Sequence, residues 1–232
     1  MAGQIPGNAR DAVSSANTRR CIDVTSSIPF NKQPLLKIKE LRAGYSQPVV
    51  GPLTANINPG EVVGFTGPNG SGKSTIMRVL TGQARAFSGQ IAPASGINIA
   101  CQAQSPYQGG ELPLRGKELL ALMGAEPEVL PQPLHHLLNR RVDRLSGGQR
   151  QSLIVWSVIG HSGELILLDE PTNNLDSQGR ELLIEGLNNL SEHRGALVIS
   201  HDHEFVRQVC CCSIPISPSG IPSSAQETRQ AA

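Results

Sequence analysis

The sequence contains few aromatic residues and almost no excess charge. Phe, Trp and Tyr make up 3% of its 232 residues, and 20 Lys and Arg residues stand against 19 Asp and Glu, for a formal net charge of +1. Proteins that bind nucleic acids commonly use clustered basic residues for the phosphates and aromatic side chains for stacking on the bases. We therefore expect no nucleic acid among the partners.

Long apolar runs are absent as well. The longest, such as 153–159 and 165–168, fall well short of the roughly 20 residues that span a bilayer, so we expect at most a peripheral contact with a membrane. The five cysteines, three of them adjacent at 210–212, have neither the spacing of a zinc site nor that of a secreted disulfide framework. Reduced thiols are the simplest interpretation.

The length predicts one domain with lobes rather than two full domains. Residues 1–33 are rich in Ser, Asn, Gly and Arg without an apolar period, and we predict a flexible extension there. We place the domain at 34–222, with a small helical subdomain at about 105–160, where leucines recur at helical intervals between prolines. Residues 223–232 are predicted to be a disordered polar tail.

The patterns on either side of this subdomain predict strands and helices in alternation. Apolar residues at every second position in 53–57 favour antiparallel strands, whereas the short apolar runs 61–66, 164–169 and 196–200 are typical of buried strands. A helix is expected from residue 73 to about Gly82.

Two further helices and a hairpin complete the expected elements. Ser146 caps a helix that runs through Trp156 to about Gly160, and another helix begins near Ser177. After Val209 we expect a frayed hairpin at the edge of a sheet, because prolines cannot donate to a β-ladder.

The strongest motif is G-x-x-x-x-G-K-[ST], which follows an expected strand and opens an expected helix. Backbone N–H groups of such a loop curl around phosphate oxygens at the positive end of the helix, while the lysine reaches the β and γ phosphates and the following serine binds Mg²⁺. An ordinary glycine-rich turn is the alternative, but such a turn has no need to follow a strand and open a helix. The residues predicted to bind nucleotide here are Gly67, Pro68, Asn69, Gly70, Ser71, Gly72, Lys73, Ser74 and Thr75.

A second motif ends a buried strand with two carboxylates, Asp169 and Glu170. Alone, such a pair would be read as acids at the start of a helix. Together with the phosphate loop, Asp169 is predicted to hold the metal and Glu170 to polarise the attacking water as a general base. His201 follows the strand at 196–200 and is predicted to bond the γ-phosphate, although a lone histidine is more often structural.

The pentapeptide Leu-Ser-Gly-Gly-Gln at 145–149 matches the signature sequence of ATP-binding cassette (ABC) proteins, so the chain resembles this family over approximately residues 35–222. The resemblance implies an α/β fold with a P-loop NTPase, RecA-like core, an antiparallel β subdomain and a small α-helical subdomain. It also implies that the signature of one domain, here Ser146, Gly147, Gly148 and Gln149, closes over ATP held by the phosphate loop of a second domain.

The resemblance carries over to three more positions. Tyr45 resembles the aromatic residue that stacks on adenine, with packing as the alternative, and Asp176 resembles the acid of the D-loop. Gln104 resembles the Q-loop glutamine that links metal and water to the coupling surface, and nearby Gln102 contests this assignment. The cofactors implied are ATP and Mg²⁺, and the activity is ATP hydrolysis.

Within the family, this chain resembles most the ATPase subunit of a transporter at the cytoplasmic face of the inner or plasma membrane. An importer is favoured, and the substrate expected for it is a metal ion or a metal chelate. Its expected partners are a transmembrane permease, a second nucleotide-binding domain and a substrate-binding protein. The Asn173–Asn174 pair keeps open a soluble ABC ATPase acting on ribosomes, DNA or a cofactor-assembly complex, and an ATP-dependent clamp without turnover is a third class.

Overall fold

The computed structural model describes residues 33–102 and 114–218, which fold around two β-sheets. One sheet has three antiparallel strands, and the other has five parallel strands. This is the α/β architecture that the sequence predicts. Within the described ranges, no helix is long and apolar enough to cross a membrane. The predicted extension and tail lie almost wholly outside these ranges, so the domain boundaries stay a prediction.

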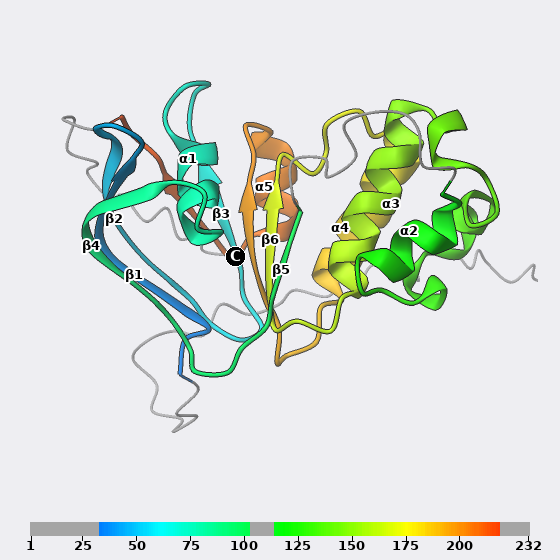
Figure 1. Cartoon of the computed structure of the whole chain (residues 1–232), viewed down its shortest axis with the longest axis horizontal. Coiled ribbons are helices and arrows are strands. Elements are labelled where there is room, and N and C mark those ends of the chain that lie inside the picture. Colours follow the sequence, from blue (N-terminus) through cyan, green and yellow to red (C-terminus); the bar gives the residue numbers. More distant parts are fainter. Residues whose placement is uncertain (1–32, 103–113, 219–232) are drawn as a thin grey trace, which may run out of the picture. The chain divides into compact units, whose positions relative to one another are not determined.

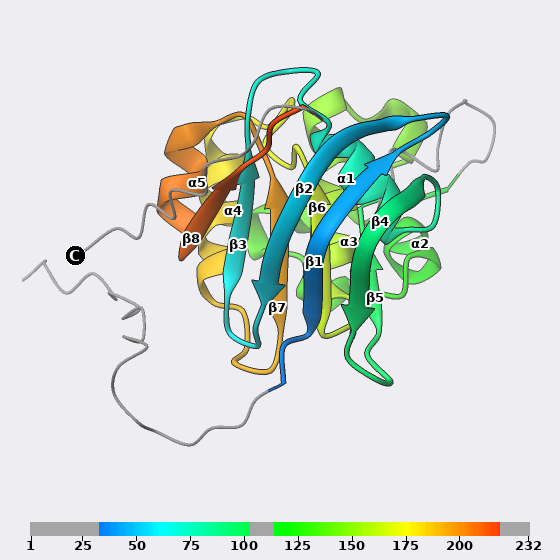
Figure 2. The same cartoon turned by 90° about the vertical axis from the view of Figure 1, so that its left-hand side faces the viewer.

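The antiparallel sheet has β1 (Leu36–Gly44) at its centre, with β2 (Pro48–Ile57) on one side and β4 (Arg85–Pro93) on the other. Figure 2 shows this sheet facing the viewer. The alternating apolar residues of β2 are buried and pair in register with those of β1, so the prediction from this pattern is confirmed.

The parallel sheet has the strand order β5 (Ile99–Cys101), β6 (Leu165–Asp169), β7 (Gly195–Ile199), β3 (Val62–Thr66) and β8 (Cys212–Pro215). Every residue of β3 and β7 is buried. Continuous burial is expected for parallel strands that are covered on both faces. Because the strands are parallel, the loops after β3, β6 and β7 all emerge at the same edge of the sheet.

The two faces of the parallel sheet contact two separate apolar cores. Leu165 and Leu167 of β6 belong to the core shared with the antiparallel sheet and with α1 (Lys73–Leu80). Ile166 and Leu168 of the same strand belong to the core shared with the other helices. Figure 1 shows the resulting layers, with α1 and the antiparallel sheet on one side of the parallel sheet and α2, α3 and α4 on the other.

The second face is covered by α3 (Gly147–Gly160), α4 (Ser177–Asn188) and α5 (His203–Val209). The expected helix start at Ser146 is confirmed, because the Ser146 hydroxyl accepts a hydrogen bond from the backbone N–H of Gln149 at 3.2 Å. The expected helix from Ser177 is confirmed as well.

In the described part of the predicted helical subdomain, a short α-helix, α2 (Gly116–Leu122), and three 3₁₀ segments precede α3. These are η1 (Pro127–Val129), η2 (Gln132–Leu137) and η3 (Val142–Arg144). The leucines of α2 and η2 pack into the same core as α3, which is why their spacing looks helical although prolines keep the segments short.

The hairpin predicted after Val209 is wrong. Residues 212–215 form β8, which pairs in parallel with β3, with Val63 opposite Cys212. The reason is that α5 carries the chain back along the sheet after β7, so the next strand must run in the same direction as β7. The expected position at a sheet edge is confirmed, since β8 is the last strand in the order.

Candidate functional site

The phosphate-loop motif lies between the end of β3 and the start of α1, as the sequence predicts. Gly70 and Gly72 have φ values of 81° and 96°, which side chains with a Cβ rarely adopt. A Cβ on Gly72 would also lie 2.6 Å from the Cβ of Val50 on β2. The antiparallel sheet is therefore in direct contact with this loop and restricts its backbone conformation.

Lys73 is buried at the first position of α1, and its ammonium group donates to the carbonyl oxygens of Gly67 and Pro68 at 2.8 and 3.0 Å. Both acceptors belong to the loop itself, so the lysine ties the first helical turn to the start of the loop. Ser71 and Thr75 are buried, whereas Asn69 is exposed.

A cleft of about 410 Å³ lies beside the phosphate loop and contains two of the three predicted metal ligands, Ser74 and Asp169, together with Gln102, the alternative to Gln104. Ser74, Gln102 and Asp169 all line it, and the side-chain oxygens Asp169 Oδ1 and Gln102 Oε1 are buried there without a hydrogen-bond partner. Burial raises the pKa of Asp169, and the charge of Glu170 adds to this rise, while a hydrogen bond from Ser74 opposes it. A hard cation would supply the partner that both oxygens lack, so the donor set fits Mg²⁺.

Glu170 follows β6 and lines the same cleft in a left-handed backbone conformation with φ of 49°. Its Oε2 lies 2.8 Å from Nδ1 of His201 and 3.4 Å from the Ser200 hydroxyl and the His201 backbone N–H. The segment after β7 therefore surrounds one oxygen of the predicted general base. In this structure His201 contacts Glu170, which brings together two of the predicted catalytic side chains.

The signature residues lie at the N-terminus of α3. Gly147 lines the cleft together with Ser74 and Glu170, and a Cβ at this position would meet no atom within 4 Å. Gly148 is different, because its Cβ would lie 2.3 Å from the carbonyl oxygen of Asn174. Sequence spacing does not reveal this close contact between the signature and the segment after Glu170.

Gln149 completes a capping box with Ser146, since its side-chain oxygen accepts from the Ser146 backbone N–H at 3.2 Å. Asp176 caps α4 in a similar manner by accepting from the backbone N–H of Gly179 at 2.7 Å. Tyr45 is 49% exposed, and its hydroxyl accepts a hydrogen bond from Arg78 at 2.5 Å. The exposed ring leaves a face that could stack on a base.

Gln104, the residue predicted to link metal and coupling surface, lies outside the described residues, so that assignment stays a prediction. The alternative, Gln102, directly follows β5 in the cleft, as Glu170 follows β6. Three further residues of the cleft, Arg150, Gln151 and Asn173, did not receive roles from the sequence. The sequence offers little indication that Gln102 follows a strand, because β5 contains only three residues.

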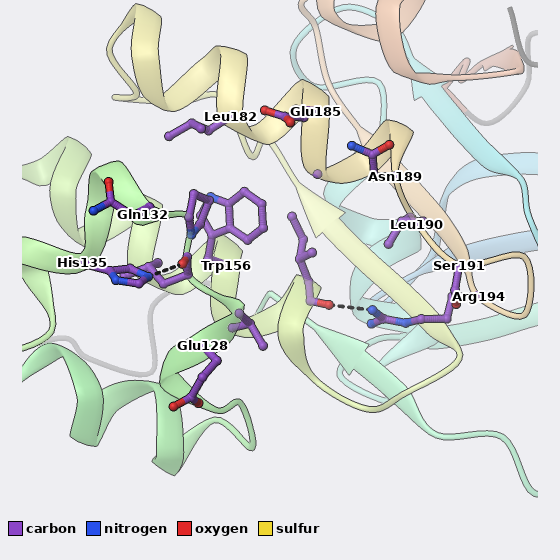
Figure 3. A pocket seen from close by; sticks show the side chains of 15 residues that line it. Glu128, Gln132, His135, Trp156, Leu182, Glu185, Asn189, Leu190, Ser191 and Arg194 are labelled. Carbon is purple, nitrogen blue, oxygen red and sulfur yellow. Dashed lines mark hydrogen bonds between the residues drawn. The ribbon is translucent and has the colours of Figure 1, made fainter. Parts of the chain in front are cut away.

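A second cavity, of about 610 Å³, lies between the 3₁₀ segments and the C-terminal half of α4 (Figure 3). Trp156 forms part of its wall, and Arg194 lies at one end, where its guanidinium donates to the carbonyl oxygens of Ile159, His161 and Gly163. None of the predicted site residues lines this cavity, so it is separate from the cleft at the phosphate loop.

Comparison with known proteins decides the family. The sequence profile of the ABC transporter family matches residues 50–173, which include the phosphate loop, the signature and both strand-end carboxylates. The chain belongs to the ABC transporter family. The ATP-binding domains of this family are ATPases, so this ABC protein binds and hydrolyses ATP. Mg²⁺ is the metal that its donor set fits.

Two curated relatives and one solved structure show the breadth of the similarity. The zinc import ATP-binding protein ZnuC of Marinobacter nauticus is 30% identical over 206 residues, which cover 84% of this ABC protein and 80% of ZnuC. The probable ATP-binding protein YheS of Escherichia coli K12 is 34% identical over 189 residues, but these cover 75% of this chain and only 28% of YheS. A transporter described as being of metal-chelate type, in an inward-facing conformation, aligns with a TM-score of 0.65 at 25% identity, over 79% of each chain.

Proposed function

We propose that this ABC protein is the ATPase subunit of an importer, peripheral to the cytoplasmic face of the inner or plasma membrane, with a transmembrane permease as its partner. The observation that supports this is the match in length to ZnuC, whose name states zinc import. The region that matches this chain covers 80% of ZnuC, so both proteins consist mainly of one ATP-binding cassette. The similarity to a metal-chelate type transporter points in the same direction. The proposed cargo is a metal ion or metal chelate, delivered by a substrate-binding protein.

The roles proposed for the phosphate loop follow from its hydrogen bonds. The backbone N–H groups of the loop bind the phosphates, and Lys73 exchanges the carbonyl oxygens of Gly67 and Pro68 for phosphate oxygens when ATP binds. Ser74 and Asp169, with Gln102 or Gln104, would hold Mg²⁺, and the bound ion would supply the positive charge that polarises the phosphoryl oxygens. Tyr45 stacks on the adenine.

Hydrolysis is assigned to Glu170 and His201. The Glu170 carboxylate accepts a proton from the attacking water, and the contacts with Ser200 and His201 hold one of its oxygens in place. We propose that His201 bonds the γ-phosphate through its other ring nitrogen, Nε2, while Nδ1 keeps its contact with Glu170. The N-terminus of α3 in a second copy, or in a paralogue, then closes over the triphosphate with Ser146 and Gly147. The loop between Glu170 and α4, which ends at Asp176, lies next to this contact.

The first experiment tests the general base. The variant Glu170→Gln keeps the size of the side chain but cannot accept the proton. We expect it to bind ATP, to accumulate dimers on size-exclusion chromatography and to lose nearly all turnover. Lys73→Ala is the contrasting variant, because it should weaken ATP binding itself. Turnover of Glu170→Gln at the wild-type rate would refute the assigned role.

The second experiment tests whether the signature acts on a second molecule. Lys73→Ala damages the phosphate loop, and Gly147→Asp places a carboxylate in the open space at the start of α3. Each variant alone should be inactive. If two chains pair head to tail, mixing the variants creates dimers with one intact site, and ATPase activity returns. If the signature acted within its own chain, the mixture would stay inactive.

The transporter assignment is tested by co-expression with polytopic membrane proteins encoded beside this chain. A stable complex in detergent with ATP-dependent metal uptake into vesicles would support the importer. The second candidate, a soluble ABC ATPase, is favoured by the Asn173–Asn174 pair and by the similarity to YheS, although the chain spans only 28% of that relative. Co-purification with ribosomes and without any membrane partner would replace the importer by this candidate.

A further inference from the structure

The loop that contains His201 is tied to α4 by one side chain, Arg180. Its guanidinium Nη1 forms an ion pair with Oδ2 of Asp202, and its Cζ lies 5.9 Å from the ring centroid of Phe205. Nη2 lies 3.9 Å from Glu204, which is more exposed. Arg180 stands one turn after Asp176, the cap of α4. It therefore joins the start of α4 to the start of α5.

Asp202 is fixed by both of its carboxylate oxygens. Oδ1 accepts the backbone N–H of Phe205 at 2.9 Å and so caps α5, while Oδ2 receives Arg180. The backbone N–H of Asp202 donates to the Ser200 hydroxyl at 3.1 Å. Burial alone would raise the pKa of Asp202, but the Phe205 N–H and the Arg180 guanidinium outweigh it, so the pKa lies below its usual value. The carboxylate is thus ionised in the pair.

Residues 200 and 201 lie directly before Asp202 and supply all three contacts to Glu170 Oε2 described above. A displacement of Asp202 would move this segment away from Glu170. We propose that Arg180 is a positioning residue for ATP hydrolysis, which holds Asp202 and thereby keeps Ser200 and His201 against the carboxylate of Glu170. The proposal rests on the role proposed for Glu170 and His201.

The arrangement also couples two segments beside the proposed nucleotide site. Asn173 and Asn174 of the loop before α4 line the cleft, and Asn174 contacts the signature at Gly148. Through Arg180, the helix that begins at the end of this loop is linked to the loop of His201. Arg180 does not line the cleft, so its effect passes through Asp202.

The test measures steady-state ATPase kinetics of the full chain. Arg180→Met keeps an unbranched apolar side chain but removes the guanidinium, which lies over the Phe205 ring and pairs with Asp202. Asp202→Asn keeps the cap on α5 but weakens the pair. We expect each to lower kcat by about fivefold or more with KM for ATP changed by less than about twofold. The double variant should be no slower than the slower single variant, because both changes break the same link. Arg207→Met, exposed on α5, is the matched control and should keep wild-type kcat.

A general defect in folding is excluded by a second readout. In a Glu170→Gln background, Arg180→Met should still accumulate the ATP-bound dimer, because the phosphate loop and the signature residues that are proposed to hold ATP are unchanged. Wild-type kcat in Arg180→Met, multiplicative losses in the double variant, or loss of the dimer would each overturn the proposal. If Arg180→Met does not fold, Asp202→Asn decides alone by the same criteria. Failure of Glu170→Gln to stop turnover would refute the proposed base, which is a different result.

Discussion

The two signature glycines offer a paired perturbation with opposite expected results. In Gly148→Ala, the new Cβ would lie 2.3 Å from the Asn174 carbonyl oxygen, whereas ordinary contacts begin at 3.4 Å. The backbone after Glu170 or the start of α3 must therefore shift by about 1 Å, and overpacking of this kind costs about 1–3 kcal/mol. In Gly147→Ala, the Cβ meets nothing within 4 Å. An alanine in place of glycine should then stabilise the fold by about 0.4–1 kcal/mol.

The ATPase activity of Gly147→Ala should fall even though its stability does not. Gly147 lies where the proposed second molecule presents its triphosphate, so an added methyl group blocks the approach of phosphate to the backbone N–H groups of α3. We expect Gly147→Ala to lower ATPase activity about tenfold or more, which corresponds to about 1.4 kcal/mol of transition-state stabilisation. Its Tm should nevertheless equal or exceed that of the wild type.

Thermal unfolding and ATPase assays on both variants check this reasoning. For a chain of this size, each kcal/mol shifts Tm by about 2–4 °C, so Gly148→Ala should melt measurably below Gly147→Ala. Equal Tm values would show that Asn174 does not press on Gly148 in solution. Full ATPase activity in Gly147→Ala would show that no phosphate approaches this end of α3, and the proposed closure by a second domain would be wrong.

Three further predictions concern the rest of the fold. Leu120→Ala removes a fully buried side chain of α2 and should cost about 2–5 kcal/mol in urea unfolding, whereas Leu122→Ala, at a position 73% exposed, should change stability by less than about 0.5 kcal/mol. Burial raises the pKa of the Cys210 thiol far above its usual value, so iodoacetamide should alkylate it much faster after denaturation than in the native protein at mildly alkaline pH, as measured by mass spectrometry. The pKa of Asp202 is lowered in the folded state, so its stabilising pair with Arg180 is fully present above the ordinary pKa of 3.8 and is lost as the pH falls through the lowered pKa of the folded state. The free energies of unfolding of the wild type and Arg180→Met, measured at a series of pH values, should therefore converge in acid.

Much of the site could be predicted from local sequence because it consists of short motifs at the ends of buried strands. The phosphate loop, Asp169 and Glu170 each follow an apolar run, and parallel strands bring their ends to one edge of a sheet. His201 follows such a run as well, and the structure places it against Glu170 at 2.8 Å. The choice between Gln102 and Gln104 could not be made in this way, since β5 is too short to show a pattern.

The direction of β8 was misjudged for a related reason. A run of cysteines and prolines shows an edge strand but not its partner, and only the path of α5 makes the strand parallel. The contact between Gly148 and Asn174 and the ion pair between Arg180 and Asp202 join residues 26 and 22 positions apart, and no spacing rule connects them.

The sequence by itself therefore determined the family, the phosphate-binding chemistry and the two carboxylates, because each depends on backbone geometry and residue type within a few positions. Only the tertiary structure decided which residues surround Glu170, the predicted general base, and which segment lies against the signature. These contacts join the ends of strands to the starts of helices that are far apart in the sequence. Their positions depend on how the two sheets and the helices pack together, which no local pattern specifies.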